Sequence, residues 1–355
     1  MNRVYLDWNA TAPLRPKARA AMLDAMDCLG NPSSVHAEGR AAKAIVEKAR
    51  GQVADLVGCD REGVVFTSGA TESAAMVLSS RKRVFALPYE HDSVLAWADE
   101  FAELDEWGLG EWPEPKGFKP DIICWQRANS ETGVVQSQPP WIPTASTFID
   151  LVQSVSRLEH QTPFIESFGI LSSHKFGGPK GAGALILGLG AEIGTKSAGS
   201  GQEKGRRSGT ENVVGIAGMG AAAEAAAKDL ADGVWLIVEQ NRNVFEERLL
   251  NEVPELIIFG KDVERLPNTS YFAVPGWKAE TQVMQMDLAG FAVSAGSACS
   301  SGKVKASRVL KAMGYDEITA GSAIRVSIGP STTAAELDSF ADAWLKEYKR
   351  FKARR

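Results

Sequence analysis

Short apolar runs alternate with longer amphipathic segments along most of the chain. The apolar runs predict buried strands at 64–67, 84–87, 122–125, 148–151, 168–171 and 182–187. Segments with helical periodicity predict helices at 16–27, 37–57, 212–231 and 234–253. Because strands that alternate with helices are typical of α/β proteins, the sequence predicts a mainly parallel sheet.

Beyond residue 240 the pattern changes to strands interleaved with helices. The expected strands lie near Leu256, Ser270, Val293 and Arg325. A chain of 355 residues, 44% of them hydrophobic, exceeds the usual size of one domain and can form two cores. We therefore predict two domains: a large one of residues 14–240, and a smaller α+β one of residues 1–13 and 241–355.

Composition excludes several classes of function. A net charge of -5 gives no electrostatic reason to bind nucleic acid, and no apolar run is long enough to span a membrane. The chain starts without an apolar leader, and its four cysteines have neither metal-ligand spacing nor the density of a disulfide scaffold. We expect a cytoplasmic protein without a structural metal. The segment 97–120, rich in acidic residues, Trp, Gly and Pro, predicts a loop-bearing connection.

A lysine on a polar turn is the strongest chemical signal. Lys175 lies in the segment 172–181, between two strands expected to be buried, and is flanked by His174 and hydroxyl groups. Burial lowers the pKa of a lysine and frees its amine to form a Schiff base with a carbonyl cofactor. The segment therefore predicts a lysine that holds such a cofactor.

A phosphate site is expected where the strand 64–67 meets the next helix. The chain breaks at Ser68 and Gly69, so the backbone N–H groups of Gly69, Ala70 and Thr71 lie at the positive end of the helix dipole. The alternative is an ordinary capped helix, since a hydroxyl residue followed by Glu is also a capping pattern.

Two polar positions at strand ends fit an aromatic cofactor. Asp150 ends an apolar strand, where a buried carboxylate needs a cationic partner such as a protonated pyridine nitrogen, and Gln153 is placed to bond a ring hydroxyl. The alternative for Asp150 is a helix N-cap. His91 follows the strand 84–87, where an imidazole can stack on a cofactor ring and move protons.

Two residues of the C-terminal part are further candidates for chemistry, one as a reactive thiol and one as a carboxylate-binding group. Cys299 lies among small and polar residues that favour an exposed, reactive thiol, whereas Cys28, Cys59 and Cys124 have the surroundings of ordinary small hydrophobic residues. Arg325 is embedded in a strand pattern, where a guanidinium is costly unless it binds a carboxylate.

These motifs, taken in order, resemble those of the cysteine desulfurases from residue 5 to about residue 340. The residues that carry the resemblance are Tyr5-Leu-Asp7 with Ala10-Thr11, Gly30-Asn-Pro-Ser-Ser34 with His36, Thr67 to Glu72, Glu90-His91, Glu131-Thr-Gly133 with Gln136, Asp150 with Gln153, Ser172 to Gly181, Arg207 to Asn212, Gly296 to Ser300 and Ile324-Arg325. The resemblance implies a fold-type I, pyridoxal 5'-phosphate-dependent enzyme of the class V group. It also implies a homodimer.

The resemblance implies roles for individual residues. Lys175 is implied as the internal aldimine lysine, with His91 stacked on the ring, Asp150 on the pyridine nitrogen and Gln153 on the ring oxygen. The implied phosphate ligands are Ala70, Thr71, Ser172, His174 and, from the partner subunit, Thr210. Ser130 replaces an asparagine that contacts the cofactor in the family, and we count it and its neighbour Asn129 among the cofactor contacts.

The same resemblance implies a reaction. Arg325 is implied to bind the carboxylate of L-cysteine, helped by Asn31 and His36, and Cys299 to accept the sulfur as a persulfide for delivery to a separate acceptor or iron-sulfur scaffold protein. A selenocysteine lyase or a class V aminotransferase shares the cofactor residues. A non-enzymatic member that serves as a partner in an assembly is a third alternative.

Overall fold

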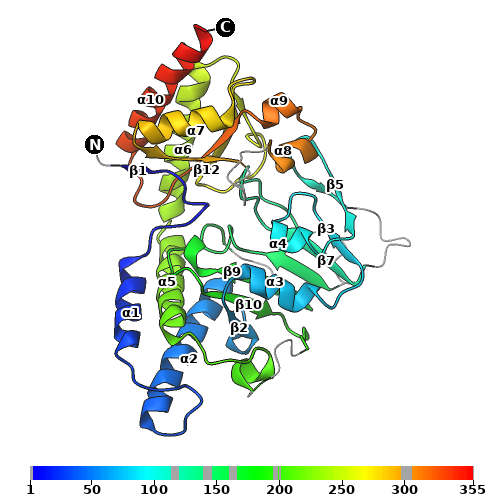
Figure 1. Ribbon diagram of the computed structural model, residues 1–355, viewed down its shortest axis with the longest axis vertical. Coiled ribbons are helices and arrows are strands. Elements are labelled where there is room, and N and C mark those ends of the chain that lie inside the picture. The colour runs from blue at the N-terminus through cyan, green and yellow to red at the C-terminus, as the bar shows by residue number, and fades with distance from the viewer. Residues whose placement is uncertain are drawn as a thin grey trace.

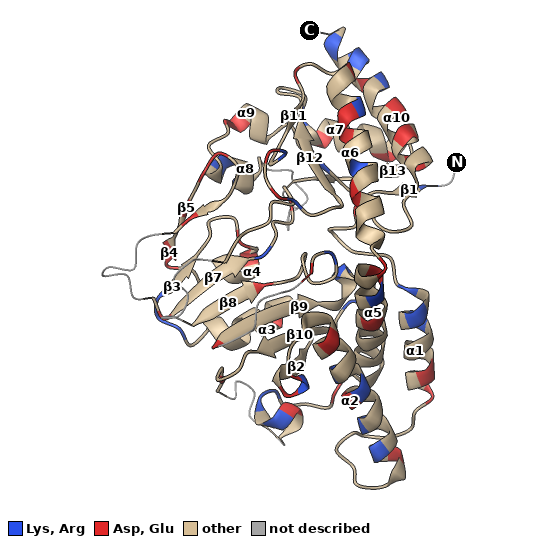
Figure 2. Cartoon of the chain, turned by 180° about the vertical axis from the view of Figure 1, so that it is seen from behind, with Lys and Arg blue, Asp and Glu red and all other residues tan. Residues whose placement is uncertain are grey.

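The computed structural model describes residues 3–112, 120–138, 146–159, 166–194, 199, 201–296 and 306–354. Its two larger sheets lie one above the other along the longest axis of the molecule (Figure 1). Lys, Arg, Asp and Glu are interspersed along the outer helices (Figure 2), in keeping with the small net charge of -5. Within the described residues, none of the helices combines the length and the apolarity needed to cross a membrane.

The larger sheet has seven strands and is mostly parallel, as predicted. In spatial order its strands are β2 (Val64–Thr67), β10 (Gly183–Leu187), β9 (Ser167–Ser172), β8 (Thr147–Asp150), β7 (Ile122–Gln126), β3 (Val84–Ala86) and β4 (Glu100–Phe101). All pairings from β9 to β4 are parallel, whereas β10 runs antiparallel to both of its neighbours. All of these strands except the edge strand β4 are buried on both faces, which explains why their sequences are mainly apolar runs.

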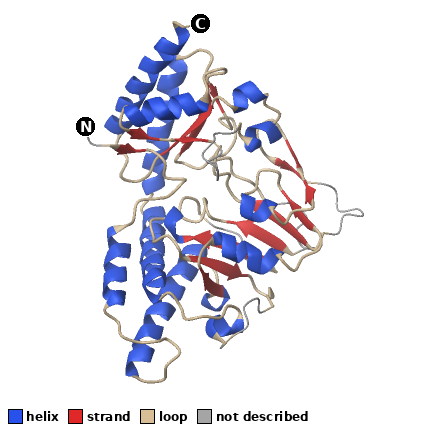
Figure 3. Ribbon diagram, viewed as in Figure 1, coloured by secondary structure: helices blue, strands red, loops and turns tan. Residues whose placement is uncertain are grey.

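Helices cover both faces of this sheet (Figure 3). The helices α1 (Pro16–Met26), α2 (Ala37–Val57) and α5 (Val213–Ala231) share one apolar core with the sheet, and α3 (Ala70–Leu78) and α4 (Asp92–Leu95) share another. The Ala-rich α5 packs closely on α2: a Cβ atom at Gly220 would lie 2.6 Å from the Cα atom of Ala49. The predicted helices 16–27, 37–57 and 212–231 are confirmed within one residue.

The second sheet is antiparallel and has four strands. They are, in order, β11 (Ile257–Ile258), β12 (Thr269–Ala273), β15 (Ala323–Ser327) and β14 (Ser294–Ala295). The helices α6 (Val234–Glu252), α7 (Ala279–Leu288) and α10 (Ala334–Lys352) enclose its core. Trp344 lies at the centre of that core, fully buried, with its indole Nε1 donating to Gln282 Oε1 at 3.0 Å. The helix predicted at 234–253 is confirmed, and it runs unbroken across residue 240, so the domain boundary there stays a prediction.

The N-terminal segment lies beside this second sheet. The strand β1 (Val4–Tyr5) pairs in parallel with β13 (Phe291–Ala292), and Asp7 forms a bridge to Ser327. The chain changes partners after β13, since β14 pairs with β15 instead. The strand predicted near Val293 is confirmed in the form of two short strands, β13 and β14, which Val293 separates.

The connection 97–120 is more ordered than predicted. Besides β4 it contains the small hairpin of β5 (Glu103–Leu104) and β6 (Gly110–Glu111). Gln136 fastens this hairpin, because its Oε1 accepts from the N–H of Gly110 at 3.0 Å and its Nε2 donates to the carbonyl of Gly108 at 2.6 Å. The short helices α8 (Arg308–Ala312) and α9 (Glu317–Ala320) lie next to it in Figure 1.

Candidate active site

The carboxyl ends of three parallel strands bring the polar residues together. Gln126, Asp150 and Ile170 are opposite one another on β7, β8 and β9, so Asp150 lies at the strand edge where open α/β sheets bind ligands. Strand β9 ends at Ser172 and continues into a single 3-10 turn, Ser173–Lys175. Lys175 therefore reaches the same edge as Asp150.

Lys175 is held by the N-terminal segment. Its Nζ atom donates to the carbonyl oxygens of Asn9, at 2.7 Å, and Ala10, at 3.0 Å. Burial, and then the positive charges of Arg325 and Arg157, lowers the pKa of Lys175 to about 8. A lysine of this pKa has a sizeable unprotonated fraction near neutral pH, which is the form that attacks a carbonyl carbon.

Two carboxyl groups are buried at the strand edge. Asp150 is 8% exposed and accepts from the N–H of Val152 at 2.8 Å, but the following residues form turns rather than the helix that the capping alternative required. Burial raises the pKa of Asp150, while the charges of His91 and Lys175 act in the opposite direction. The pKa of Glu90 is raised well above its usual value by burial and by the nearby Asp150, which favours the neutral form of Glu90.

The predicted phosphate residues lie on adjoining elements. Gly183 is opposite both Ser172 and Thr67 in the sheet, and a Cβ atom at Gly183 would lie 2.5 Å from the Cα atom of Gly69. This close approach places Ser172 beside the start of α3. There the first-turn N–H groups of Ala70 and Thr71 find no acceptor among the described residues, as expected at a helix start.

His174 lies next to Ser172 and is neutral. Its Nδ1 is 3.1 Å from the hydroxyl oxygen of Thr11. Burial, and then the charges of Lys175 and Lys180, lowers the pKa of the imidazole to about 4. A neutral ring can donate one hydrogen bond to a phosphate without adding charge.

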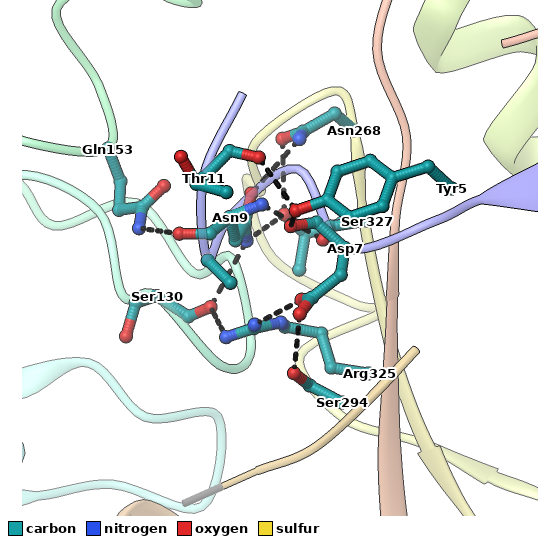
Figure 4. A network of polar contacts seen from close by, with 12 residues as sticks. Tyr5, Asp7, Asn9, Thr11, Ser130, Gln153, Asn268, Ser294, Arg325 and Ser327 are labelled. Carbon is teal, nitrogen blue, oxygen red and sulfur yellow. Dashed lines mark hydrogen bonds and ion pairs between the residues drawn. The ribbon is translucent and has the colours of Figure 1, made fainter. Parts of the chain in front are cut away.

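Arg325 is ion-paired in the single chain (Figure 4). Its guanidinium donates to Asp7 Oδ1 at 2.7 Å and to the carbonyl oxygen of Ser130 at 2.9 Å, and Asp7 Oδ2 accepts from the hydroxyl of Ser294 at 2.9 Å. Its buried Nε has no partner within the described residues. Ser130 thus contacts Arg325 through its backbone carbonyl oxygen, and the predicted contact of its side chain with the cofactor stays a prediction. Asn129 carries a buried Nδ2 that lacks a partner in the same described part of the chain.

Sequence reasoning missed two residues that organise the site. Asn9 accepts from Lys175 and, at 3.1 Å, from Gln153 Nε2 through its carbonyl, while its side chain bonds Ser130, Thr269 and Asn268. Arg157 donates to Gln153 and, at 3.4 Å, to the carbonyl of Lys175. The sequence carried a signal for Asn9, which lies between the motif residues Asp7 and Ala10. For Arg157 the sequence offered only its position four residues after Gln153.

Several other predicted residues are exposed in the single chain. His91 is exposed and caps α4 through Nδ1, which accepts from the N–H of Ser93 at 3.1 Å. Asn31 and His36 are exposed beyond the far end of α1, whose 11 residues carry the chain about 16 Å away from Gly177. Within one chain they do not join Arg325, contrary to the simplest form of the prediction. Thr210 is also exposed.

The predicted sulfur acceptor, Cys299, lies outside the described residues. The chain on either side of it is anchored at the site. Ser294 is opposite Arg325 in the sheet, and the hydroxyl of Ser307 donates to Glu131 Oε2 at 2.5 Å. The other cysteines agree with their predicted ordinary roles: Cys124 is fully buried, and burial raises the pKa of Cys59 to about 12.

Comparison with known proteins identifies the family. The description "Aminotransferase class-V" matches residues 4–108 and 117–340, and the chain belongs to this family of fold-type I enzymes. A cysteine desulfurase of Cereibacter sphaeroides is 35% identical over 95% of this chain and 94% of its own length. Cysteine desulfurase IscS of Dictyoglomus turgidum is 32% identical over 96% and 93%. Within the family the chain is a member of the cysteine desulfurases.

Solved structures agree with this assignment. The X-ray structure of a NifS-like protein from Rickettsia africae superposes with a TM-score of 0.89 and 28% identity, covering 98% of this chain and all of the other. A second NifS-like protein superposes with a TM-score of 0.87, also at 28% identity. The predicted fold class, a large mainly parallel sheet with a smaller α+β part, is confirmed.

Proposed function

We propose that this enzyme is a pyridoxal 5'-phosphate-dependent cysteine desulfurase that converts L-cysteine to L-alanine and takes the sulfur onto Cys299. The observation that carries the proposal is the arrangement around Lys175. An amine with a lowered pKa lies at the same strand edge as a buried carboxylate, Asp150, and beside a buried guanidinium, Arg325. These three groups suit a carbonyl cofactor with a cationic ring and an amino-acid carboxylate.

The described residues fit this cofactor. Asn129 Nδ2 and Arg325 Nε are buried donors that lack partners in the described part of the chain, so a ligand rich in acceptors can satisfy them. Asp150 would bind the protonated ring nitrogen and Gln153 the ring oxygen. The start of α3, with Ser172 and His174, would bind the phosphate. When bound, the cofactor supplies an electron sink for negative charge at the substrate carbon.

The chain's own residues would then carry the reaction. Lys175 would hold the cofactor and move the proton at the substrate α-carbon, and Arg325 would bind the substrate carboxylate in competition with Asp7. The thiolate of Cys299 would attack the substrate sulfur, so that the carbon–sulfur bond breaks and a sulfur–sulfur bond forms. The substrate carbon takes up a proton. The products are alanine and a Cys299 persulfide, which together contain all atoms of the cysteine and the thiol.

We also propose a cytoplasmic homodimer that passes its sulfur to an acceptor or iron-sulfur scaffold protein. Thr210, Asn31 and His36 are exposed, and the latter two lie far from Lys175 within one chain. This placement supports a dimer in which these residues complete the site of the other subunit. Reducing conditions are required as well, because the acceptor thiol must be free before each turnover.

The test is to incubate the purified protein with L-cysteine and a reductant and to measure alanine and sulfide together. We expect equal amounts from the wild type, none from Cys299→Ala, and wild-type amounts from the control Cys59→Ala, whose thiol is held protonated. Alanine release that persists in Cys299→Ala would refute the role of Cys299. Selenide from selenocysteine in that variant would indicate a selenocysteine lyase, and amino-group exchange with a keto acid an aminotransferase.

A further inference from the structure

Arg157 is a buried cation without a carboxylate partner in the described part of the chain. It is 3% exposed, yet no described Asp or Glu lies within ion-pair distance of it. Other buried arginines have such partners: Arg50 pairs with Glu203 and Arg265 with Glu246, each at 2.8 Å. An uncompensated buried charge is costly, so packing alone does not account for the burial of Arg157.

The contacts of Arg157 join two parts of the site. One terminal nitrogen donates to the carbonyl oxygen of Gln153 at 2.8 Å and to Gln153 Oε1, and the other donates to the carbonyl of Lys175 at 3.4 Å. The guanidinium also lies 5.8 Å from the ring centre of Trp235. It therefore links the turn after β8 to the turn that carries Lys175.

These bonds decide which way the Gln153 amide points. A guanidinium has donors only, so the atom of Gln153 that faces it must be the oxygen. Gln153 Nε2 is then the end left to donate, and it donates to the carbonyl of Asn9 at 3.1 Å. Arg157 and the Asn9 carbonyl thus fix the amide from both ends, so that Nε2 is the end available to an acceptor at the site, and loss of Arg157 would weaken this orientation.

Arg157 also acts on Lys175 through its charge. Together with burial and Arg325, it shifts the pKa of Lys175 downward to about 8. Its own pKa is lowered to about 9 by burial and by Arg325, so it remains mostly charged at neutral pH. Replacing Arg157 with a neutral residue would raise the pKa of Lys175, and less free amine would be present at a given pH.

We propose that Arg157 is a positioning residue with two tasks: it orients Gln153 so that Nε2 donates to the ring oxygen of the cofactor, and its charge increases the unprotonated fraction of the Lys175 amine. The proposal rests on the proposed function for the identity of the cofactor. The second task concerns the cofactor-free protein alone. A matched set of variants separates the tasks, because Arg157→Gln removes the charge, whereas Arg157→Lys keeps a charge but loses the planar fork.

The first experiment measures the amine without activity. The full-length protein, freed of cofactor, is acylated with a small amine-reactive reagent over a range of pH, and the modification of Lys175 is followed by peptide mass spectrometry. We expect an apparent pKa near 8 for the wild type and for Arg157→Lys, and an upward shift of about one unit for Arg157→Gln. The control Arg242→Gln, which removes another buried arginine, should leave the profile unchanged. An unshifted profile in a folded Arg157→Gln would overturn the electrostatic task.

The second experiment measures pyridoxal 5'-phosphate affinity by the visible absorption band. We expect Arg157→Lys and Gln153→Ala each to weaken binding about tenfold, and the double variant to be no weaker than either single one, since both act through one hydrogen bond. Wild-type affinity in Arg157→Lys, or additive losses in the double variant, would overturn the orienting task. Absence of desulfurase activity in the wild type would refute the proposed function. The acylation profile would still test the effect of the Arg157 charge on Lys175.

Discussion

The two sheets supply different halves of the site. The seven-stranded parallel sheet carries Lys175 and Asp150 at the ends of strands that are buried on both faces. The four-stranded antiparallel sheet carries Arg325 and the start of the segment that leads to Cys299. The first half therefore suits a cofactor and the second a substrate. The carbonyl oxygen of Ser130 joins them, since it accepts both from Asn9 Nδ2 and from the guanidinium of Arg325 (Figure 4). This division predicts that mutations can change cofactor binding and substrate binding separately.

The largest effect is expected on the cofactor half. Lys175→Ala should lower the desulfurase rate by at least about 1,000-fold, because it removes both the cofactor attachment and the proton carrier. The visible absorption band of the bound cofactor should disappear. Lys180→Ala, a change at a nearby lysine that does not contact Asn9, should retain both. An unaltered visible band in Lys175→Ala would separate this lysine from the cofactor.

The substrate half should respond in KM. Arg325→Gln should raise KM for L-cysteine by about 100-fold, since charge-assisted hydrogen bonds contribute about 3 kcal/mol, while the cofactor spectrum stays near that of the wild type. Steady-state kinetics and a cofactor titration on the same sample distinguish the two halves. If the cofactor were lost while KM stayed normal, the assignment of Arg325 to the substrate half would be wrong.

Cofactor binding should depend on pH through Lys175. The amine attacks only when unprotonated, so the association rate of pyridoxal 5'-phosphate with the cofactor-free protein should rise about tenfold per pH unit below the lysine pKa and level off above about pH 8. An ordinary lysine would level off only near its unperturbed value of 10.5. Stopped-flow absorbance at a series of pH values measures this, and a rate that kept climbing past pH 9 would contradict the lowered pKa.

The smallest effect is expected at Glu90. Its pKa is raised well above the usual range by burial and Asp150, so it is already neutral and Glu90→Gln should change the rate by less than about threefold at neutral pH. The matched change Asp150→Asn removes a charge and should cost much more, at least about tenfold. Equal rates for Glu90→Gln and Asp150→Asn would show that the two carboxyl groups do not differ in charge.

Local patterns account for the elements and for the main functional residues. The apolar runs of β7 and β8 and the polar turn at Lys175 could be predicted because each depends on neighbours in sequence. The burial of Arg157 could not, since it arises where the turn after β8 packs under Lys175 and Trp235. Likewise the ion pair of Asp7 and Arg325 spans 318 positions, and the break at Val293 follows from a change of strand partner. Contacts between segments that are far apart in the sequence leave no periodic pattern in a single sequence.

The placement of the N-terminal segment has a consequence for synthesis of the chain. Asn9, whose carbonyl holds the Lys175 amine, is synthesised long before Ser327, yet its backbone N–H donates to the hydroxyl oxygen of Ser327, 318 residues later. A ribosome-bound chain that ends before residue 320 can build the seven-stranded sheet but not the completed lysine site, and we expect it to bind pyridoxal 5'-phosphate weakly. The lysine site thus reaches its final form only once residue 327 has been synthesised, later than the strands of the seven-stranded sheet.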